Sequence, residues 1–111
     1  MSTSIELKAQ LGIWKNQMDQ LIKNDKESIP KSKFSFDEND LGISFNTLIR
    51  PNFDAIENAK KIEFYIKKNL LIAVDIYDLK IKKDDYLPEY LIEEFYVTCD
   101  VLEKLISELD N

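Results

Sequence analysis

Glycine and proline are scarce in this chain of 111 residues, which holds two glycines and three prolines. Glycine and proline weaken helices and mark the tight turns of β-rich folds, so their scarcity favours long helices over turn-rich sheets. The length is that of one domain, large enough for a hydrophobic core but too small for two. We therefore expect residues 1–111 to form a single globular domain that is mainly α-helical.

Three segments repeat apolar residues at the spacing of an α-helix. The first covers about residues 4–24, and its apolar stripe is Leu7, Leu11, Trp14, Met18 and Leu21. The last follows Pro88, and its stripe is Leu91, Phe95, Cys99, Leu102, Ile106 and Leu109. The middle segment runs from about residue 56 to 81, and Phe64 and Leu71 lie off its stripe. Apolar residues on several sides indicate a central helix that more than one neighbour covers.

Residues 34–49 read FSFDENDLGISFNTLI, in which every second position is mostly apolar. Period two is typical of a strand with one buried face, and DEND has the composition of a turn, so we predict a β-hairpin. The stretch LLIAVDIYDLKI, residues 70–81, is either the end of the middle helix or a third strand. We prefer the helix, because no glycine or proline separates the two parts. The predicted fold is a three-helix bundle with a long central helix and a small β-hairpin packed on it; the alternative is an α+β fold.

Negative charge is concentrated in the last quarter of the chain. Residues 1–83 carry 12 acids and 14 bases, whereas residues 84–111 carry nine acids and one base. Such a block argues against nucleic acid and anionic membranes as partners of this part of the molecule, because both are negative. We interpret it as a surface that binds a basic protein; the alternative is a solvated coat that only keeps the chain soluble.

The predicted partner-binding site combines the acidic residues that a helical wheel places opposite the last apolar stripe with those of the hairpin tip. Its members are Glu89, Glu93, Tyr96, Asp100 and Glu103, together with Asp37, Glu38 and Asp40. Tyr96 is the expected anchor, since aromatic residues often dominate binding energy; otherwise it lies at the edge of the core. A second stripe consists of Tyr90, Val97, Val101 and Leu105. It either packs inside the molecule or forms a homodimer contact.

The residue types that carry most enzyme chemistry are missing or misplaced. There is no histidine, the commonest general base and a frequent metal ligand. The one cysteine, Cys99, lies on an apolar stripe, which favours an inert buried thiol. The stretch DENDLG begins like a calcium loop, but Leu41 and Leu48 occupy two of its ligand positions. We therefore predict no catalytic residue, no metal and no cofactor, and interpret the chain as a non-enzyme.

The N-terminal segment has no signal-peptide pattern, and the longest apolar run, residues 70–74, is too short for a bilayer. A cytoplasmic protein is expected, and the excess of lysine over arginine suggests a bacterium or its phage. In profile the chain resembles bacterial immunity proteins, which are small, acidic inhibitors of nuclease toxins. The first hypothesis is such an inhibitor. The alternatives are a phage-encoded nucleic-acid mimic that inhibits a host defence complex, an acidic secretion chaperone, and a structural subunit of a larger complex.

Overall fold

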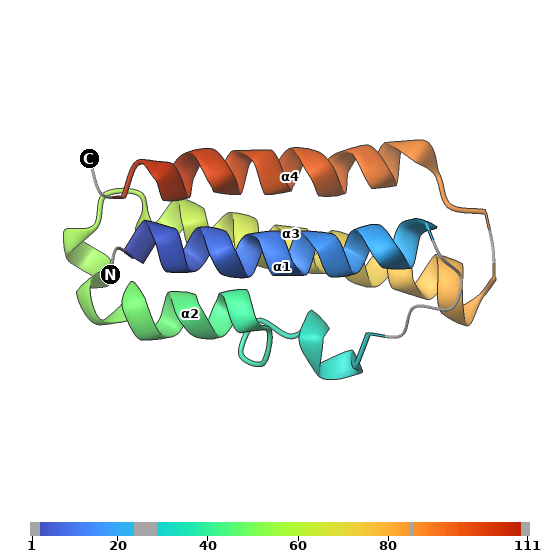
Figure 1. The fold of residues 1–111 in the computed structure, drawn as a ribbon, viewed down its shortest axis with the longest axis horizontal. Coiled ribbons are helices and arrows are strands. Elements are labelled where there is room, and N and C mark those ends of the chain that lie inside the picture. The colour runs from blue at the N-terminus through green and yellow to red at the C-terminus, as the bar shows by residue number, and fades with distance from the viewer. Residues whose placement is uncertain (1–2, 24–28, 85, 110–111) are drawn as a thin grey trace.

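The computed structural model describes residues 3–23, 29–84 and 86–109 of the chain. The α-helices within these ranges are α1 (Thr3–Lys23), α2 (Asp40–Leu48), α3 (Ala59–Tyr77) and α4 (Glu89–Ser107). Shorter helical turns connect them, namely η1 (Lys31–Phe34), η2 (Arg50–Ala55) and the π-helical turn η3 (Asp78–Lys82). Every regular element in the described part of the chain is thus helical, and the fold is bundle-like (Figure 1).

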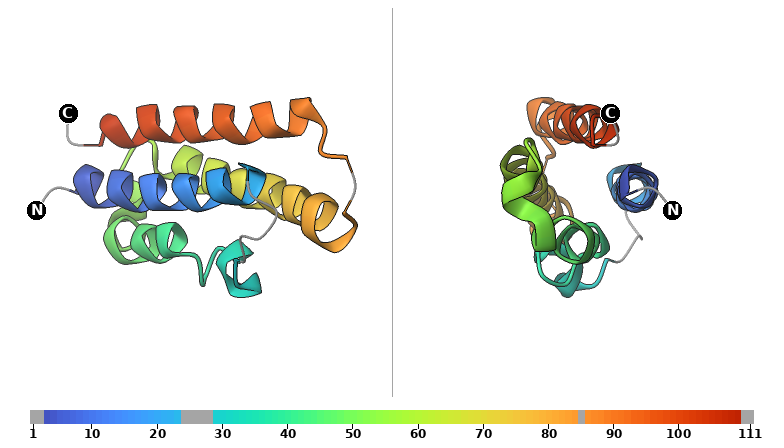
Figure 2. Two further views of the ribbon diagram at one scale, coloured as in Figure 1. Left: turned by 45° about the vertical axis from the view of Figure 1, so that its right-hand side comes forward. Right: turned by 90° about the vertical axis from the view of Figure 1, so that its left-hand side faces the viewer.

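The helices lie along the long axis of a molecule that measures 44 × 24 × 20 Å. α1 and α3 run in one direction, and α2 and α4 run in the opposite direction (Figure 1). Seen end-on, α1 and α3 lie on opposite sides of the interior, with α4 above and α2 below (Figure 2). α3 and α4 form the most extensive contact, whereas α1 contacts α2 and α4 more than it contacts α3. One face of α4 therefore belongs to the core and the opposite face to the solvent.

The core is built from the apolar stripes of the long helices. α1 buries Leu7, Leu11, Trp14, Met18 and Leu21. α4 buries Leu91, Phe95, Cys99, Leu102 and Ile106. α3 adds Ala59, Ile62, Ile66, Leu70, Ala73 and Ile76. Removing a large apolar side chain from water stabilises the fold by about 1.5–3 kcal/mol, so these stripes supply the main driving force of folding. The helices predicted at 4–24 and after Pro88 are confirmed.

The predicted β-hairpin is wrong, because residues 34–49 form the end of η1, a turn and the helix α2. Leu41, Phe45 and Ile49 are buried, and they are four residues apart, so they satisfy a helical period as well as a period of two. Ile43 and Thr47 fill the alternate positions that a strand would bury, yet both are exposed. The spacing of the buried residues is therefore helical.

Two local features stabilise α2 in place of a strand. Asn39 caps the helix: its side-chain oxygen accepts a hydrogen bond from the backbone N–H of Leu41 at 2.9 Å, and its amide donates to the carbonyl of Lys33 at 2.7 Å. Gly42 lies against the backbone of Phe36, where a Cβ atom would overlap the carbonyl oxygen. The DEND sequence, interpreted as a hairpin turn, thus contains the start of a helix.

The third-strand alternative at residues 70–81 is also wrong. α3 continues to Tyr77, and η3 follows it directly, with the backbone N–H of Lys83 bonded to the carbonyl of Asp78 at 3.0 Å. The ammonium group of Lys80 in this turn donates to the carbonyl of Ile22 and so satisfies a free carbonyl at the end of α1. The expectation that neighbours cover α3 on several sides does not hold for Phe64 and Leu71, which are 59% and 69% exposed.

Candidate functional site

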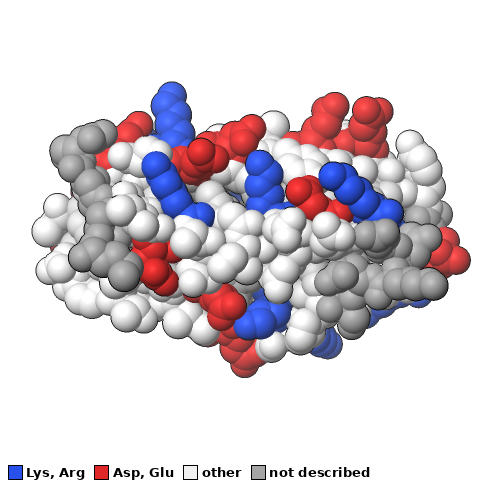
Figure 3. Space-filling view, viewed as in Figure 1, with Lys and Arg blue, Asp and Glu red and all other residues white. Residues whose placement is uncertain are grey.

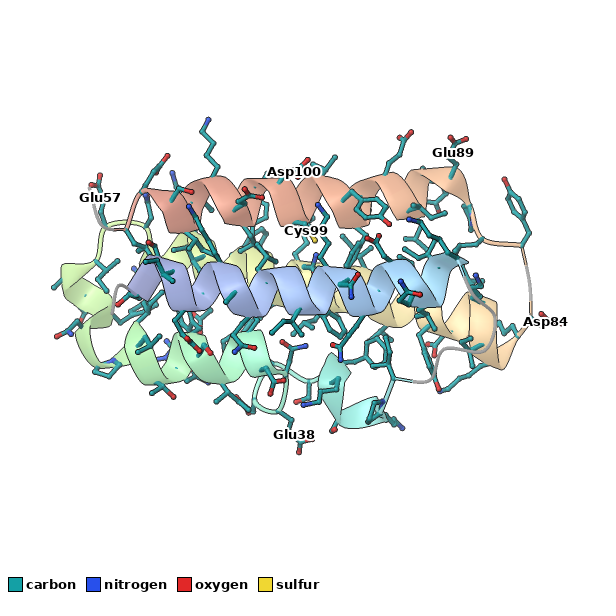
Figure 4. All side chains as sticks on the ribbon, viewed as in Figure 1. Glu38, Glu57, Asp84, Glu89, Cys99 and Asp100 are labelled. Carbon is teal, nitrogen blue, oxygen red and sulfur yellow. The ribbon has the colours of Figure 1, made fainter. Side chains whose placement is uncertain are left out.

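The solvent side of α4 carries a row of carboxylates. Glu89, Glu93, Asp100 and Glu103 are all exposed, and we call these four residues the acidic face. The first three lie opposite the buried stripe of the helix, and Glu103 lies beside them. Glu89 and Asp100 lie on the outer side of α4, away from the bundle interior (Figure 4). In the space-filling view, acidic side chains dominate the edge of the molecule that α4 forms (Figure 3). The helical wheel therefore predicted the exposure of this row correctly.

The acidic face forms no ion pair with another described residue. Within the described residues, the ion pairs within 4.0 Å join Lys33 to Asp40, Arg50 and Lys67 to Glu63, and Lys82 to Asp78. None of these pairs involves α4. Two lysines of α3 lie against aromatic rings: the ammonium nitrogen of Lys67 lies 4.9 Å from the centre of the Phe36 ring, and that of Lys68 lies 5.9 Å from the Tyr65 ring centre.

Tyr96 belongs to the contact between α1 and α4. The ring is half-buried, and its hydroxyl donates a hydrogen bond to a carboxylate oxygen of Asp19 on α1. The ammonium nitrogen of Lys15 lies 5.8 Å from the ring centre. Burial, together with the hydrogen bond to the Asp19 carboxylate and its charge, raises the pKa of the Tyr96 hydroxyl above its ordinary value. Tyr96 therefore lies where the alternative interpretation put it, at the edge of the core, and it links two helices.

The exposed aromatic side chains near the acidic face are Tyr86 and Tyr90. Tyr90 is 64% exposed and lies at the start of α4, one turn before Glu93 and Glu94. Tyr86 precedes the helix and is also exposed. The sequence places Tyr90 off the core stripe, on the second stripe with Val97, Val101 and Leu105, and this position is the signal for its exposure. Tyr90 is the aromatic side chain that a partner of the acidic face can contact.

The three acidic residues expected at the hairpin tip do not join the acidic face. Asp37 and Glu38 are exposed in the turn before α2, and Asp40 pairs with Lys33 at 3.3 Å. Glu38 points away from the bundle on the α2 side, whereas Glu89 and Asp100 lie on the α4 side (Figure 4). The predicted site therefore separates into two groups on opposite sides of the molecule.

A buried polar network fixes the position of α4. Asn69 of α3 accepts a hydrogen bond from the indole N–H of Trp14 at 2.9 Å and donates one to the hydroxyl of Thr98 at 2.9 Å. The Thr98 hydroxyl in turn donates to the carbonyl of Phe95 at 2.8 Å. These bonds connect α1, α3 and α4 at the centre of the bundle. Periodicity does not reveal such a network, because Asn69 occupies a core position with a polar side chain.

Cys99 belongs to the same network and has the properties of a structural thiol. Its sulfur lies 3.4 Å from the amide nitrogen of Asn69, and burial raises its pKa to about 11. A hollow of about 170 Å³ between α1 and α4 is lined by Lys8, Leu11, Gly12, Lys15, Cys99 and Glu103. Among the described residues, no group of three His, Cys, Asp or Glu side chains is arranged to hold a metal ion.

A second surface lies beside the acidic face, between α4 and α3. Lys60, Lys61, Phe64, Tyr65, Val101 and Leu105 line an open hollow of about 430 Å³ there. The stripe of Tyr90, Val97, Val101 and Leu105 does not pack on α1 or on a hairpin: Tyr90 and Val97 are exposed, and Val101 and Leu105 are half-buried at this hollow. The sequence indicated this stripe but not its exposure.

In the part of the chain that the structure describes, no helix is long and apolar enough to cross a membrane. Comparison with protein-family models, with curated proteins and with solved structures finds no match. The function must therefore be argued from the surfaces themselves.

Proposed function

We propose that the chain is a small cytoplasmic inhibitor that binds one basic protein through the acidic face of α4. A bacterial immunity protein that neutralises a nuclease-type toxin is the form of inhibitor that we favour. The observation that carries the proposal is the row of exposed α4 carboxylates without a cationic partner in the described residues. Like charges on one helix face repel by a few tenths of a kcal/mol per pair, so this row does not serve the stability of the helix.

The mechanism follows from the chemistry of a nuclease. Such an enzyme holds phosphates, so its substrate cleft is basic, and a row of carboxylates can occupy or cover that cleft in their place. Complementary fields raise association rates by about 10- to 1,000-fold over those of neutral surfaces, and the gain falls as salt screens the charges. Glu89, Glu93, Asp100 and Glu103 supply the field in this proposal. Tyr90 supplies apolar contact area at one end of the row.

Affinity capture tests the proposal with two variants of equal net charge. The first carries Glu89→Lys, Glu93→Lys and Asp100→Lys on the acidic face. The matched control carries Asp37→Lys, Glu38→Lys and Asp54→Lys, three exposed residues outside α4. Both variants shift the net charge from −6 to zero, so a general effect of charge or solubility acts on both alike.

The wild type and the control should hold the same basic protein at low salt, and the α4 variant should lose it. The captured protein is then purified, and its enzymatic activity is measured with and without the wild-type chain. Loss of that activity supports an inhibitor. Capture of the same protein by all three baits would remove the acidic face from the proposal, and a captured protein that stays fully active would contradict inhibition. Capture of several unrelated DNA-binding proteins would instead support the nucleic-acid mimic.

The exposed apolar side chains of α3 and α4 favour one second candidate, the acidic secretion chaperone. A chaperone needs apolar surface for an unfolded client, and Phe64, Leu71 and Val97 provide it. The two candidates differ in the state of the bound protein. An inhibitor binds a folded, active partner. A chaperone binds an unfolded segment of its client, and a protease cleaves that segment when the chaperone is absent.

A further inference from the structure

Five apolar side chains lie on the outer side of α3 and α4, and three of them, Phe64, Val101 and Leu105, line the open hollow. The five are Phe64, Leu71, Val97, Val101 and Leu105, and we call them the apolar α3–α4 face. On α4, Val97, Val101 and Leu105 follow each other at intervals of four residues, and on α3 Phe64 and Leu71 are seven residues apart, so each set shares one side of its helix. Hydrogen bonds from Asn58 to Glu108 and from Asn69 to Thr98 set the register that brings Phe64 beside Val101 and Leu105.

This surface is unusually exposed for its composition. Phe64, Leu71 and Val97 are 59%, 69% and 58% exposed. Single exposed apolar residues are ordinary, but a group beside an open hollow is typical of an interaction site. Removing apolar area from water is favourable, so covering the group stabilises a contact.

The charges that border the surface differ between its two helices. Along the face, α3 exposes Lys60, Lys61 and Lys68 together with Asp75, and α4 exposes Glu94 and Glu108 together with Lys104. Positive charge is therefore in excess along α3, and negative charge is in excess along α4. Such a surface is complementary to itself, provided that α3 of one copy lies on α4 of another.

We propose that the apolar α3–α4 face binds a second copy of this chain, with a twofold axis parallel to the helices. This axis places α3 of each copy on α4 of the other, so lysines meet carboxylates on both sides of an apolar centre. The two helices in each contact run antiparallel, which also suits their dipoles. A twofold axis perpendicular to the helices would put α3 on α3 and bring the lysines together. The excess of lysines on α3 disfavours that arrangement.

The side of the molecule that carries the face is large enough for a dimer contact. α3 and α4 each have 19 residues, so each is about 28 Å long and about 10 Å wide, and together they give a projected area of about 560 Å². The accessible area of a corrugated helix surface is larger than its projection, and a standard interface takes about 800 Å² from each partner. The carboxylates of the acidic face lie roughly 100° away around α4, so the dimer leaves them exposed, whereas Tyr90 lies on the stripe of Val97 and Val101 and borders the contact. The proposal stands independently of the proposed inhibitor function.

Sedimentation equilibrium of the purified chain tests the dimer directly. The wild type should reach twice the 13.0 kDa chain mass as its concentration rises. Phe64→Lys should raise the dissociation constant at least tenfold without affecting folding, since the side chain is exposed. Ile13→Lys on α1 is the matched control: Ile13 is 52% exposed but outside the face, and this variant should dimerise like the wild type.

Charge reversal tests the arrangement of the two copies. One variant carries Lys61→Glu and Lys68→Glu, and the other carries Glu94→Lys and Glu108→Lys. Each alone should be a weaker dimer than the wild type, because α3 and α4 then carry like charge. Mixing the two should restore a dimer that contains one chain of each, since both contacts again join opposite charges. A wild type that stays monomeric at the highest soluble concentration, or a Phe64→Lys variant that dimerises unchanged, would overturn the dimer. A reversed α3 variant as tight as the wild type would overturn the α3-on-α4 arrangement.

Discussion

Replacing Asn69 by leucine removes the centre of the polar network that joins three helices. Asn69 is 1% exposed, and its side-chain oxygen is the acceptor for the indole N–H of Trp14 at 2.9 Å. Leucine has a similar volume but no polar atoms, so the Trp14 N–H would remain buried without a partner. The Thr98 hydroxyl would keep its bond to the Phe95 carbonyl. The main effect of the substitution therefore falls on Trp14.

The magnitude follows from the groups that lose partners. Leaving one buried donor unsatisfied costs about 1–3 kcal/mol, and the lost bond to Thr98 adds a fraction of that. We expect Asn69→Leu to lower the free energy of unfolding by about 2–3 kcal/mol, a large part of the 5–15 kcal/mol typical of a domain. Trp14→Phe alone orphans the oxygen of Asn69 and also loses packing. In the double variant neither orphaned group remains, because the N–H and its acceptor are both absent.

Urea unfolding followed by far-UV circular dichroism measures all four members of this cycle. Circular dichroism is preferred to tryptophan fluorescence, since Trp14 is the only tryptophan. The double variant should be more stable than the sum of the single losses predicts, by about 1–2 kcal/mol. Equal slopes against urea would show that the losses belong to the folded state. Additive losses would refute the reasoning, because they would mean that Trp14 and Asn69 do not depend on each other.

Three further predictions concern glycine positions, an ion pair and the thiol. Gly12→Ala should raise the unfolding free energy by up to about 1 kcal/mol, because alanine favours a helix over glycine and the added Cβ meets nothing within 4 Å. Gly42→Ala should lower the unfolding free energy, because the added Cβ clashes with the backbone of Phe36. Urea unfolding measures both changes. The Arg50 guanidinium, through its hydrogen bond, holds the pKa of Glu63 below its usual 4.5, so the charged form is favoured by folding. Glu63→Gln should therefore destabilise the chain at neutral pH, and the difference should shrink as the pH falls below 4.5 through the lowered pKa; equal losses at pH 7 and pH 3 would contradict this linkage. Cys99, with a pKa of about 11, should react with a disulfide reagent at neutral pH far more slowly in native protein than in urea.

The long helices could be predicted from the sequence because their apolar residues obey one period over many turns. α1 buries every residue that its helical stripe indicated, and α4 buries all of its stripe except Leu109, which follows the helix and is half-buried. Residues 41–49 could not be assigned this way, since Leu41, Phe45 and Ile49 fit a strand and a helix equally well. The deciding features were a helix cap by Asn39 and the close approach at Gly42. Both depend on the position of the preceding backbone, which the spacing of apolar residues does not predict.

The candidate site shows the same division between local pattern and tertiary contact. The exposure of Glu89 and Asp100 follows from their position on one helix, and the wheel was sufficient. The burial of Tyr96 depends on Asp19 of another helix, and the exposure of Phe64 depends on the absence of a covering element among the described residues. Sequence period shows which residues share a side, but it does not show how many neighbours cover that side.

The most direct test of the acidic face is the association rate of the captured partner with three purified chains at several salt concentrations. These are the wild type, the Glu89→Lys, Glu93→Lys, Asp100→Lys variant, and the Asp37→Lys, Glu38→Lys, Asp54→Lys control. We predict that the wild type associates fast and that its rate falls steeply as salt rises, and that the control has a similar rate and salt dependence. The α4 variant should associate at least tenfold more slowly, with little dependence on salt. Equal rates and equal salt slopes for the two triple variants would contradict a binding role for the acidic face.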